Sequence, residues 1–468
     1  MKHKFKAFLL LLSLLFVFNV KAELDLKLPK GFASPEQTSA SQQQFFAPLK
    51  SQINGLKILR KLRASKEYIE DPEVSEWIRA LGNRLVSRSL GSTSPFYFLV
   101  SKNTSLNAFA TEGGVVVINA GLILKSDSES EVAAVLSHEI AHVSQRHITR
   151  LKAKAEKIEW GSKAALVAGL IASTKNTQAG QAILNTTMAT IAHKQLAFTR
   201  EAEAEADREG LRILTRAGYD PLAMPSVLQK LEQFANNNTA GVREYLQSHP
   251  LTQRRVSDTF VRAKRLGKHQ RKSWPAFFYV RERIRVLSNS PISTPNNVTA
   301  SVKRYSMAQT LNKQKHLLKA LTILRNNSKE RPEILLRANL LATTHQLKKA
   351  QNLLKQLAVN APQSEAISIA LAEVYIASNQ AQKAWEVLER IKVSEQTSLL
   401  FFETMQKAAR LTQKASLVYF TSAQRNLRIS KYNIAKTQLK RAIKLRGNDK
   451  NHYKMQKMLS LLNNLIKP

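Results

Sequence analysis

The spacing of apolar and polar residues divides the first part of the chain into a few elements. Residues 74–86 carry apolar side chains on one stripe at helical spacing, which predicts an amphipathic helix. Two runs rich in aromatic and β-branched residues, 95–100 and 113–121, lie between glycine, proline and asparagine and predict β-strands. A long helical pattern follows over 129–157, with Ser128 as a suitable N-cap.

The most apolar stretch of the chain lies at its beginning. Three lysines precede an apolar run over 7–20, and the small residue Ala22 follows it. This pattern predicts a secretory signal peptide over 1–22, cleaved before Glu23. An uncleaved anchor is the alternative, although the run is shorter than the roughly 20 residues that span a bilayer. The polar segment 34–44 that comes next is expected to be extended.

The second part of the chain repeats a helical unit. Similar segments begin at Lys319, Lys349 and Lys383, which are 30 and 34 residues apart, and each has an alanine as its second residue (Ala320, Ala350, Ala384). Pro332 and Pro362 recur in the same frame. A helix-turn-helix unit of about 34 residues is the tetratricopeptide period, and alanine fits where paired helices approach closely. A generic helical bundle is the alternative.

A segment crowded with proline, asparagine and serine, 291–302, has no apolar period and marks a domain boundary. Before it we expect an α-rich domain with a small β-sheet over 23–290, with further helices over 163–196 and 200–217. After it we expect an all-α solenoid of repeats over 303–468. A length of 468 residues is consistent with two or more domains.

The composition of the chain excludes some classes of protein and some kinds of site. Cysteine is absent, which excludes a disulfide framework and thiol catalysis. The most apolar segment after the start, 164–172, is bounded by lysines and is too short to cross a bilayer. The exported chain is therefore expected to lack further membrane spans.

The chain is strongly basic, with 72 Lys and Arg against 34 Asp and Glu. Region 303–468 holds 30 basic and 9 acidic residues, and 425–457 holds 11 basic residues against one acid. An exported chain rarely meets nucleic acid, so no nucleic-acid partner is expected. An anionic membrane surface or an acidic protein is the better expectation, and a merely solvated face is the alternative.

The sequence "HEIAH" at 138–142 carries candidate metal chemistry. On a helix, positions four apart differ by about 40°, so His138 and His142 project from one face and can share an ion. Glu139 lies about 100° round, where it can reach a water on the ion without binding the ion. Zinc hydrolysis needs this division between ligands and a proton acceptor. The alternative is a pair of surface histidines. His147 is about 140° from His142 and is expected to point elsewhere.

A catalytic zinc also needs a third protein ligand. The acidic run 199–210 offers two helical faces, Glu201 with Glu205 and Glu203 with Asp207. Spacing does not choose between these faces, and an ordinary charged helix surface is the alternative.

Four motifs in order resemble one family, the M48 metallopeptidases: "NAFATEGGVVVINAGL" (107–122), "HEIAH", "TREAEAEAD" (199–207) and "SHPLTQRRV" (248–256). Within that family the chain is similar to periplasmic members with a C-terminal tetratricopeptide domain, and the resemblance covers nearly the whole mature chain. It implies a zincin-like α+β metallopeptidase domain followed by the solenoid.

The resemblance also assigns roles. In the family the zinc-binding glutamate stands four residues before the aspartate of a Glu-x-x-Ala-Asp motif, which implies Glu203 as the third ligand of one Zn²⁺ per chain. Asp207 then suits the second shell, where it would accept the free N–H of a ligand histidine. On this reading Glu201 and Glu205 remain surface charges.

The resemblance further implies that the strand carrying Gly114, Val115, Val116 and Val117 aligns the substrate. An edge strand has unpaired backbone groups with which an extended peptide can pair. We expect this strand to be an edge, and an interior strand is the alternative.

His249 and Arg255 are the remaining candidates. Either side chain near zinc could stabilise the oxyanion of the tetrahedral intermediate. His249 could instead occupy the open coordination position and keep the enzyme latent, or it could cap a turn before Pro250.

The expected function is that of a periplasmic zinc endopeptidase in quality control and assembly of outer-membrane β-barrel proteins. Stalled or misfolded barrel proteins would be the substrates, and the repeats would recruit them or the assembly machinery. Two alternatives remain. One is a chaperone or scaffold with a latent or mainly structural zinc site, and the other is an adhesin for anionic surfaces built on the basic tail.

Overall fold

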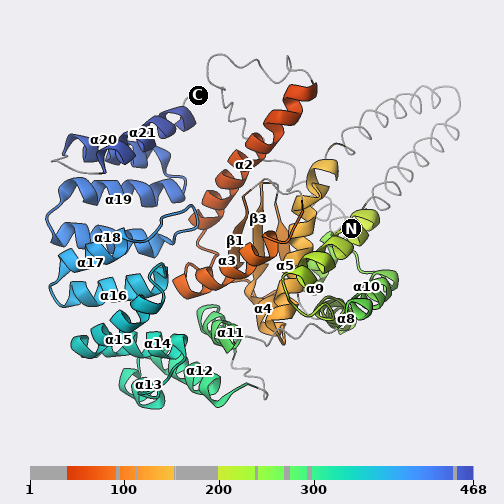
Figure 1. The fold of residues 1–468 in the computed structure, drawn as a ribbon, viewed down its shortest axis with the longest axis horizontal. Helices are drawn as coiled ribbons and strands as arrows, with labels where there is room; N and C mark the ends of the chain where they lie inside the picture. The colour runs from red at the N-terminus through yellow and green to blue at the C-terminus, as the bar shows by residue number, and fades with distance from the viewer. Residues whose placement is uncertain are drawn as a thin grey trace, which may run out of the picture.

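A computed structural model describes most of the chain (Figure 1), namely residues 40–90, 95–111, 113–151, 153, 199–237, 241–267, 275–291, 298–445 and 451–466. The predicted fold class is confirmed, because an α-rich part with a small sheet precedes a stack of paired helices. The predicted signal peptide (1–22), the helix over 163–196 and the apolar segment 164–172 lie outside the described residues. Within the described residues, every helix is too short or too polar to cross a membrane.

The sheet has three strands, β1 (Tyr97–Ser101), β2 (Ala108–Ala110) and β3 (Val115–Asn119), in the order β1-β3-β2. β3 pairs with β1 in parallel and with β2 in antiparallel register. All five residues of β3 are buried. The expectation that this strand is an edge is therefore wrong, since β3 is the central strand and β2 forms one edge.

The outer edge of β1 is closed by the rest of the chain. The N–H of Ile69 donates to the Val100 carbonyl at 2.8 Å. The side chain of Gln396, from the repeat part, accepts a hydrogen bond from the N–H of Phe98 at 3.2 Å and donates to the Phe96 carbonyl at 3.3 Å. An amide side chain thus takes the place of a neighbouring strand.

Helices α3 (Pro72–Val86) and α5 (Glu129–Ser144) pack beside the sheet. The predicted cap of α5 is present, because the Ser128 hydroxyl accepts from the Glu131 N–H. The helix was expected to continue to residue 157, and this was wrong. Arg146 has φ of 54°, a left-handed conformation that ends the helix, and residues 147–151 form a separate helical segment.

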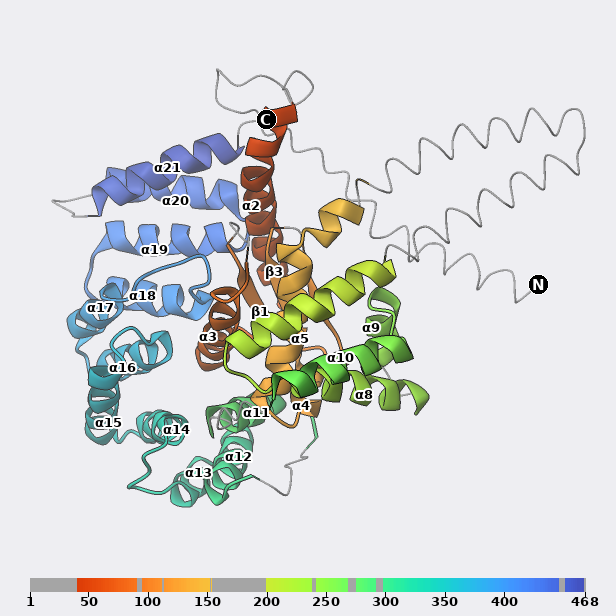
Figure 2. The same cartoon turned by 45° about the vertical axis from the view of Figure 1, so that its right-hand side comes forward.

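Helix α2 (Ala40–Ala64) was not predicted, and part of it was expected to be extended. Apolar and polar residues are mixed along α2 without a strong apolar stripe. Leu59 is buried against Tyr97, Val115 and Val117. α2 lies between the sheet and the C-terminal helices (Figures 1 and 2). Its place is decided by packing from two sides.

The described residues of the first part form further helices that lie in the sequence between the sheet and α11 (Pro275–Leu287). They are α4 (Ala120–Lys125), the helix over 199–216, α8 (Ala223–Asn236), α9 (Val242–Ser248) and α10 (Gln253–Leu266). α8 packs against both α5 and α10. This arrangement brings residues from distant parts of the sequence to one face of α5.

The second part is a stack of antiparallel helix pairs, as the repeat pattern predicted (Figure 1). Its helices are α12 (Ala300–Lys313), α13 (Leu317–Ile323), α14 (Arg331–Thr343), α15 (Leu347–Asn360), α16 (Glu365–Ala377), α17 (Ala381–Glu389), α18 (Leu399–Leu411), α19 (Ala415–Arg428), α20 (Tyr432–Lys444) and α21 (His452–Ile466). Ala320, Ala350 and Ala384 are completely buried. These alanines lie where paired helices approach most closely, which explains their recurrence.

The predicted linker, 291–302, does not separate two independent cores. Helix α11 (Pro275–Leu287), just before it, packs against α12, which begins at Ala300 inside the predicted linker. Phe277 belongs to the core around the sheet, whereas its neighbour Tyr279 belongs to the core that contains Tyr305. α11 therefore joins both parts, and the exact domain boundary remains a prediction.

The two parts also contact each other through polar groups. Glu76 of α3 accepts hydrogen bonds from the backbone N–H of Ala366 at 2.9 Å and from the Ser364 hydroxyl, at the N-terminus of α16. Arg331 donates to the same carboxylate at 2.7 Å. Arg63 of α2 donates to the Glu395 carbonyl at 2.7 Å. A carboxylate at a helix N-terminus is favourable, so the contact aligns α16 with the first part.

Candidate metal centre

α5 presents two histidines to one point, as its helical spacing predicted. The Nε2 atoms of His138 and His142 are 3.0 Å apart, and the two rings lie edge to face. At this distance the two nitrogens repel each other if both carry a proton or if both present a lone pair. A cation that takes a lone pair from each would satisfy both rings.

The helix over 199–216 supplies the carboxylate. Glu203 places Oε2 at 3.3 Å from Nε2 of His138 and Oε1 at 3.3 Å from Nε2 of His142. Of the two faces left open by the sequence, the structure turns the Glu203 and Asp207 face toward α5. Glu201 is exposed, and Glu205 pairs with His147 instead.

His249 completes the cluster from the end of α9. Its Nδ1 is 3.0 Å from Oε1 of Glu203 and 3.4 Å from Nε2 of His138. The backbone N–H of His249 caps α9 by donating to the Tyr245 carbonyl, and the Tyr245 ring stacks on the imidazole. The backbone of His249 thus makes the capping contact, which was one of the alternatives for this residue, and its ring lies in the cluster.

These four residues form a donor set that fits a metal ion. One ligand atom each from His138, His142, Glu203 and His249 lies within 4.8 Å of the others. Three imidazole nitrogens and one carboxylate oxygen are ligands that suit Zn²⁺. The site is largely buried, which limits competition from bulk water.

Glu139 lies beside the cluster and faces it. Its side chain is buried, and its Oε1 has no hydrogen-bond partner among the described residues. The nearest imidazole nitrogen, Nε2 of His249, is 3.5 Å from this oxygen. A buried carboxylate oxygen that is free to accept a proton is what a general base requires.

Asp207 and Arg255 support the cluster from behind. Asp207 accepts from Nδ1 of His138 at 3.1 Å, as its expected role requires. Arg255 grips Asp207 with Nε and Nη2 at 2.7 and 2.8 Å, and its Nη1 is 2.9 Å from both the Pro250 carbonyl and Oε2 of Glu203. All its nitrogens contact the protein, a geometry that favours positioning of the carboxylates, and the oxyanion role stays a prediction.

The electrostatics of the cluster follow from burial and pairing. Burial alone would lower the pKa of His138, but hydrogen bonds to Asp207 and Glu203 raise it to about 10. Burial would raise the pKa of Glu203, yet hydrogen bonds from three histidines hold it well below its usual range. Glu203 is therefore ionised across the physiological range, as a metal ligand must be.

His147 lies next to the cluster, contrary to the prediction that it points elsewhere. Its Nδ1 is 3.0 Å from Nδ1 of His142, and burial lowers its pKa to about 4. The angle calculated from a continuous helix failed because the chain leaves the helix at Arg146. The position of His147 just after the end of α5 was the one feature of the sequence that could have indicated its place beside His142.

The structure does not bring the expected substrate strand to the site in the expected way. Gly114, Val115, Val116 and Val117 lie at the start of β3 or within it, between two neighbours. The Gly114 carbonyl accepts from the N–H of Tyr97 at 2.8 Å. These backbone groups are already paired, so they cannot pair with a substrate.

The fold and the converging donors define a class of protein. Residues 72–260 match peptidase family M48, and residues 341–400 match the tetratricopeptide repeat. The chain therefore carries an M48 metallopeptidase domain followed by tetratricopeptide repeats, which confirms the resemblance seen in the sequence.

Particular relatives share this domain. The chain is 37% identical over 226 residues to the beta-barrel assembly-enhancing protease of Yersinia pestis, covering 48% of this chain and 46% of the relative. It is 36% identical over 232 residues to the protease of the same name from Escherichia coli strain K12, covering 50% and 47%. The mitochondrial metalloendopeptidase OMA1 of Arabidopsis thaliana is 28% identical over 233 residues, covering 48% and 44%. The chain thus spans about half the length of the curated relatives it matches.

Proposed function

We propose that the chain is a zinc-dependent endopeptidase with one Zn²⁺ per chain. The convergence of His138, His142 and Glu203 beside the buried Glu139, in the segment that matches family M48, carries this proposal. When bound, zinc would polarise the scissile carbonyl and lower the pKa of a water toward about 7.

The residues of the chain divide the remaining work. His138, His142 and Glu203 would hold the ion, and Asp207 holds the His138 ring in place through Nδ1. Glu139 would take a proton from the attacking water and return it to the leaving amine. His249 lies where a fourth ligand would lie, so we propose that the free enzyme is latent.

Metal content and casein cleavage test this proposal together. Wild type should bind one zinc per chain and cleave casein slowly, because the free enzyme is proposed to be latent. Glu139→Gln should bind zinc without cleaving, and Glu203→Gln should lose zinc. Glu201→Gln is the matched control, because Glu201 is exposed on the same helix. A wild type without zinc, or a Glu139→Gln variant with full activity, refutes the peptidase function.

For substrate alignment we propose β2 in place of β3. Phe109 pairs with Val117 in the antiparallel ladder, flanked by hydrogen bonds from Asn119 to Asn107 and from Thr111 to Val115. The backbone groups of Ala108 and Ala110 therefore point away from β3. β2 packs against α5, so a peptide added to this edge would run past the metal site.

A proline on this edge tests the assignment. Ala110→Pro removes one outward N–H, a change that edge strands tolerate. We expect KM for peptides to rise while zinc content is unchanged, and Ala110→Val, which keeps the N–H, should resemble wild type. Equal kinetics for both variants would assign alignment to another segment.

We further propose that the enzyme works in the periplasm on stalled or misfolded outer-membrane β-barrel proteins. The name of the bacterial relatives, beta-barrel assembly-enhancing protease, and a predicted signal peptide over 1–22 support this. Unfinished barrels expose unpaired strands, which an edge such as β2 could capture. Within the ranges predicted from the sequence, 23–290 would cleave and 303–468 would recruit substrate or the assembly machinery. Fractionation of a tagged chain tests the location.

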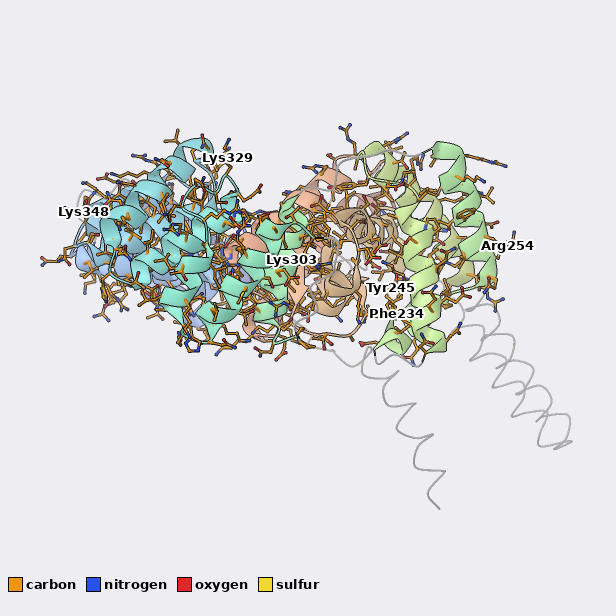
Figure 3. The ribbon with its side chains drawn as sticks, turned by 90° about the horizontal axis from the view of Figure 1, so that it is seen from below. Phe234, Tyr245, Arg254, Lys303, Lys329 and Lys348 are labelled. Atoms are coloured by element: carbon orange, nitrogen blue, oxygen red, sulfur yellow. The ribbon has the colours of Figure 1, made fainter. Side chains whose placement is uncertain are left out.

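An anionic membrane surface is a second proposed partner. The repeat part is strongly basic, and Figure 3 shows Lys303, Lys329 and Lys348 on its surface, with Arg254 on the opposite flank of the molecule. Binding to vesicles that contain anionic phospholipid, lost at high salt, is expected. Equal binding to neutral vesicles would exclude an electrostatic contact.

A chaperone or scaffold with a latent or mainly structural zinc site is the alternative function. The contacts between the repeats and the first part favour this alternative, since a scaffold needs its two parts held together. Full rescue of a deletion strain by Glu139→Gln would support the scaffold, whereas failure to rescue would support proteolysis.

A further inference from the structure

A second line of contacts runs behind the metal site, on the side of His142 that faces away from it. Nδ1 of His142 meets Nδ1 of His147 at 3.0 Å, with the two rings nearly perpendicular. Nε2 of His147 is 3.2 Å from Oε2 of Glu205. Arg150 donates to the same oxygen at 2.9 Å. The four side chains form one continuous chain of hydrogen bonds.

The end of α5 is shaped to place His147 there. Arg146 has a φ of 54°, and its N–H donates to the Val143 carbonyl at 3.0 Å. This turn brings the next residue back toward the helix, so His147 is only 4% exposed although it follows a surface turn. A straight continuation of α5 would carry the ring away from His142.

The arrangement parallels the one behind His138. There, Nδ1 of His138 meets Asp207, and Arg255 holds that carboxylate. Each histidine of the HEIAH motif therefore has its outer nitrogen tied to a carboxylate that an arginine holds. For His138 the link is direct, and for His142 it passes through one additional imidazole.

The proton count is consistent along the second chain. A neutral His142 that turns the Nε2 lone pair toward the metal site carries its proton on Nδ1, and donates it to Nδ1 of His147. His147 then carries its own proton on Nε2 and donates it to Glu205. Every contact has one donor and one acceptor, and the chain selects a single tautomer for His142.

We propose that His147, supported by Glu205, is a positioning residue that fixes the ring and tautomer of His142 for metal binding. This inference rests on the proposed function, because it needs His142 to be a ligand. It goes beyond that function by assigning a role to two residues outside the ligand set. Glu205 thereby becomes part of the site and not only a surface charge.

Zinc affinity of the purified full chain, measured by competition with a chromophoric chelator, tests the proposal. Losing an outer-shell partner typically weakens metal binding by about 10- to 100-fold, and this is the loss expected for His147→Ala. His147→Asn places an acceptor oxygen near the position of Nδ1, so it should bind zinc more tightly than His147→Ala. Glu205→Gln should weaken binding less than His147→Ala, and Glu201→Gln should leave it unchanged.

A second readout separates positioning from general loosening. Val143→Ala removes partly buried volume from the same end of α5 without touching an imidazole, and it should keep wild-type zinc affinity. The visible absorption of bound Co²⁺, which reports ligand geometry, should change in His147→Ala and not in Val143→Ala.

The outcomes are distinct. Unchanged zinc affinity in His147→Ala, equal losses in His147→Asn and His147→Ala, or an equal loss in Val143→Ala each overturns the positioning role. If zinc binding by the wild type still depends on Glu203, the proposed function survives that result. A wild type that binds no zinc overturns both.

Discussion

His249 is the fourth possible ligand of the cluster, and in the proposed latent state it takes the position that a water would need. We expect His249→Ala to keep zinc, because three protein ligands remain, and to cleave casein faster than wild type, because a coordination position becomes open. Zinc content and initial rates of casein cleavage measure both effects.

The stacked Tyr245 provides a control for the latent state. Tyr245→Phe keeps the ring that stacks on His249 and should leave the rate near that of wild type. A His249→Ala variant that keeps zinc but loses cleavage would show that His249 takes part in the reaction and does not block it.

Arg255 is the main counter-charge in the site. Arg255→Gln leaves the buried Asp207 and Glu203 with His138 as their remaining cation. The free energy of unfolding of the metal-free protein should therefore fall, by up to about 3–5 kcal/mol. Its neighbour Arg254 has an exposed side chain and lies on the outer flank (Figure 3), so Arg254→Gln should change it by less than about 0.5 kcal/mol. Urea unfolding measures both, and equal effects would contradict the positioning role.

Sequence predicted those site residues whose geometry one helix determines. His138 and His142 follow from helical spacing alone. For the second helix, spacing left two faces open, and only the family resemblance pointed to Glu203 with Asp207. The contacts of Arg255 could not be predicted, because its partners are 48 and 52 residues away in the sequence. Whether the Arg255 side chain reaches them depends on how α10 packs. His147 was misplaced because one left-handed residue, Arg146, invalidates the helical angle.

At the scale of elements, the approach of two helices fixes the ligand set. Gly210 lies on the helix that carries Glu203, and a Cβ there would lie 3.1 Å from the Cα and N atoms of His138. Gly210→Ala should push this helix away from α5. The resulting strain, about 1–3 kcal/mol, should exceed the helix-propensity gain of about 1 kcal/mol.

We therefore expect Gly210→Ala to reduce both zinc affinity and thermal stability. Chelator competition and thermal unfolding measure these quantities. Arg216→Ala, at an exposed position on the same helix, is the control and should change neither. Wild-type zinc affinity in Gly210→Ala would mean that the close approach of the helices does not set the ligand geometry.

The sheet shows what a local pattern can and cannot predict. Two of its strands, β1 and β3, were predicted from β-branched and aromatic runs. β2 has three residues and leaves no recognisable alternation, so it was missed. Strand order depends on which segments return to pair, and without β2 the central β3 was taken for an edge.

At the scale of the whole molecule, the repeats are fastened to the peptidase part. Glu76 joins α3 to the N-terminus of α16 through Ala366, Ser364 and Arg331. Glu76→Ala leaves these donors without their acceptor, and we expect the free energy of unfolding to fall by about 1–3 kcal/mol. The variant should also be cut faster between α11 and α12 by a protease.

Limited proteolysis and calorimetry check this prediction. Glu386→Ala is the control, since Glu386 is exposed and contacts Gln382 within its own helix. Identical digestion of the two variants would show that Glu76 does not hold the parts together.

The two-part organisation was visible in the sequence, but the contact between the parts was not. The recurrence of Ala320, Ala350 and Ala384 predicted the stack, because helix pairs repeat the same close approach. Glu76 and Arg63 belong to no repeat, and Gln396 lies in a loop between two repeat helices. Their partners lie about 290 to 330 residues away. Such contacts depend on the folded shapes of both parts of the chain.

The Gln396 side chain on the edge of β1 has one further consequence. A chain truncated before the loop that carries Gln396 would bare the backbone of Phe96 and Phe98 along β1. Two such fragments could then join their sheets edge to edge, and the shortened protein would tend to aggregate. In the full chain, the Gln396 side chain covers these backbone groups and so closes this part of the β1 edge.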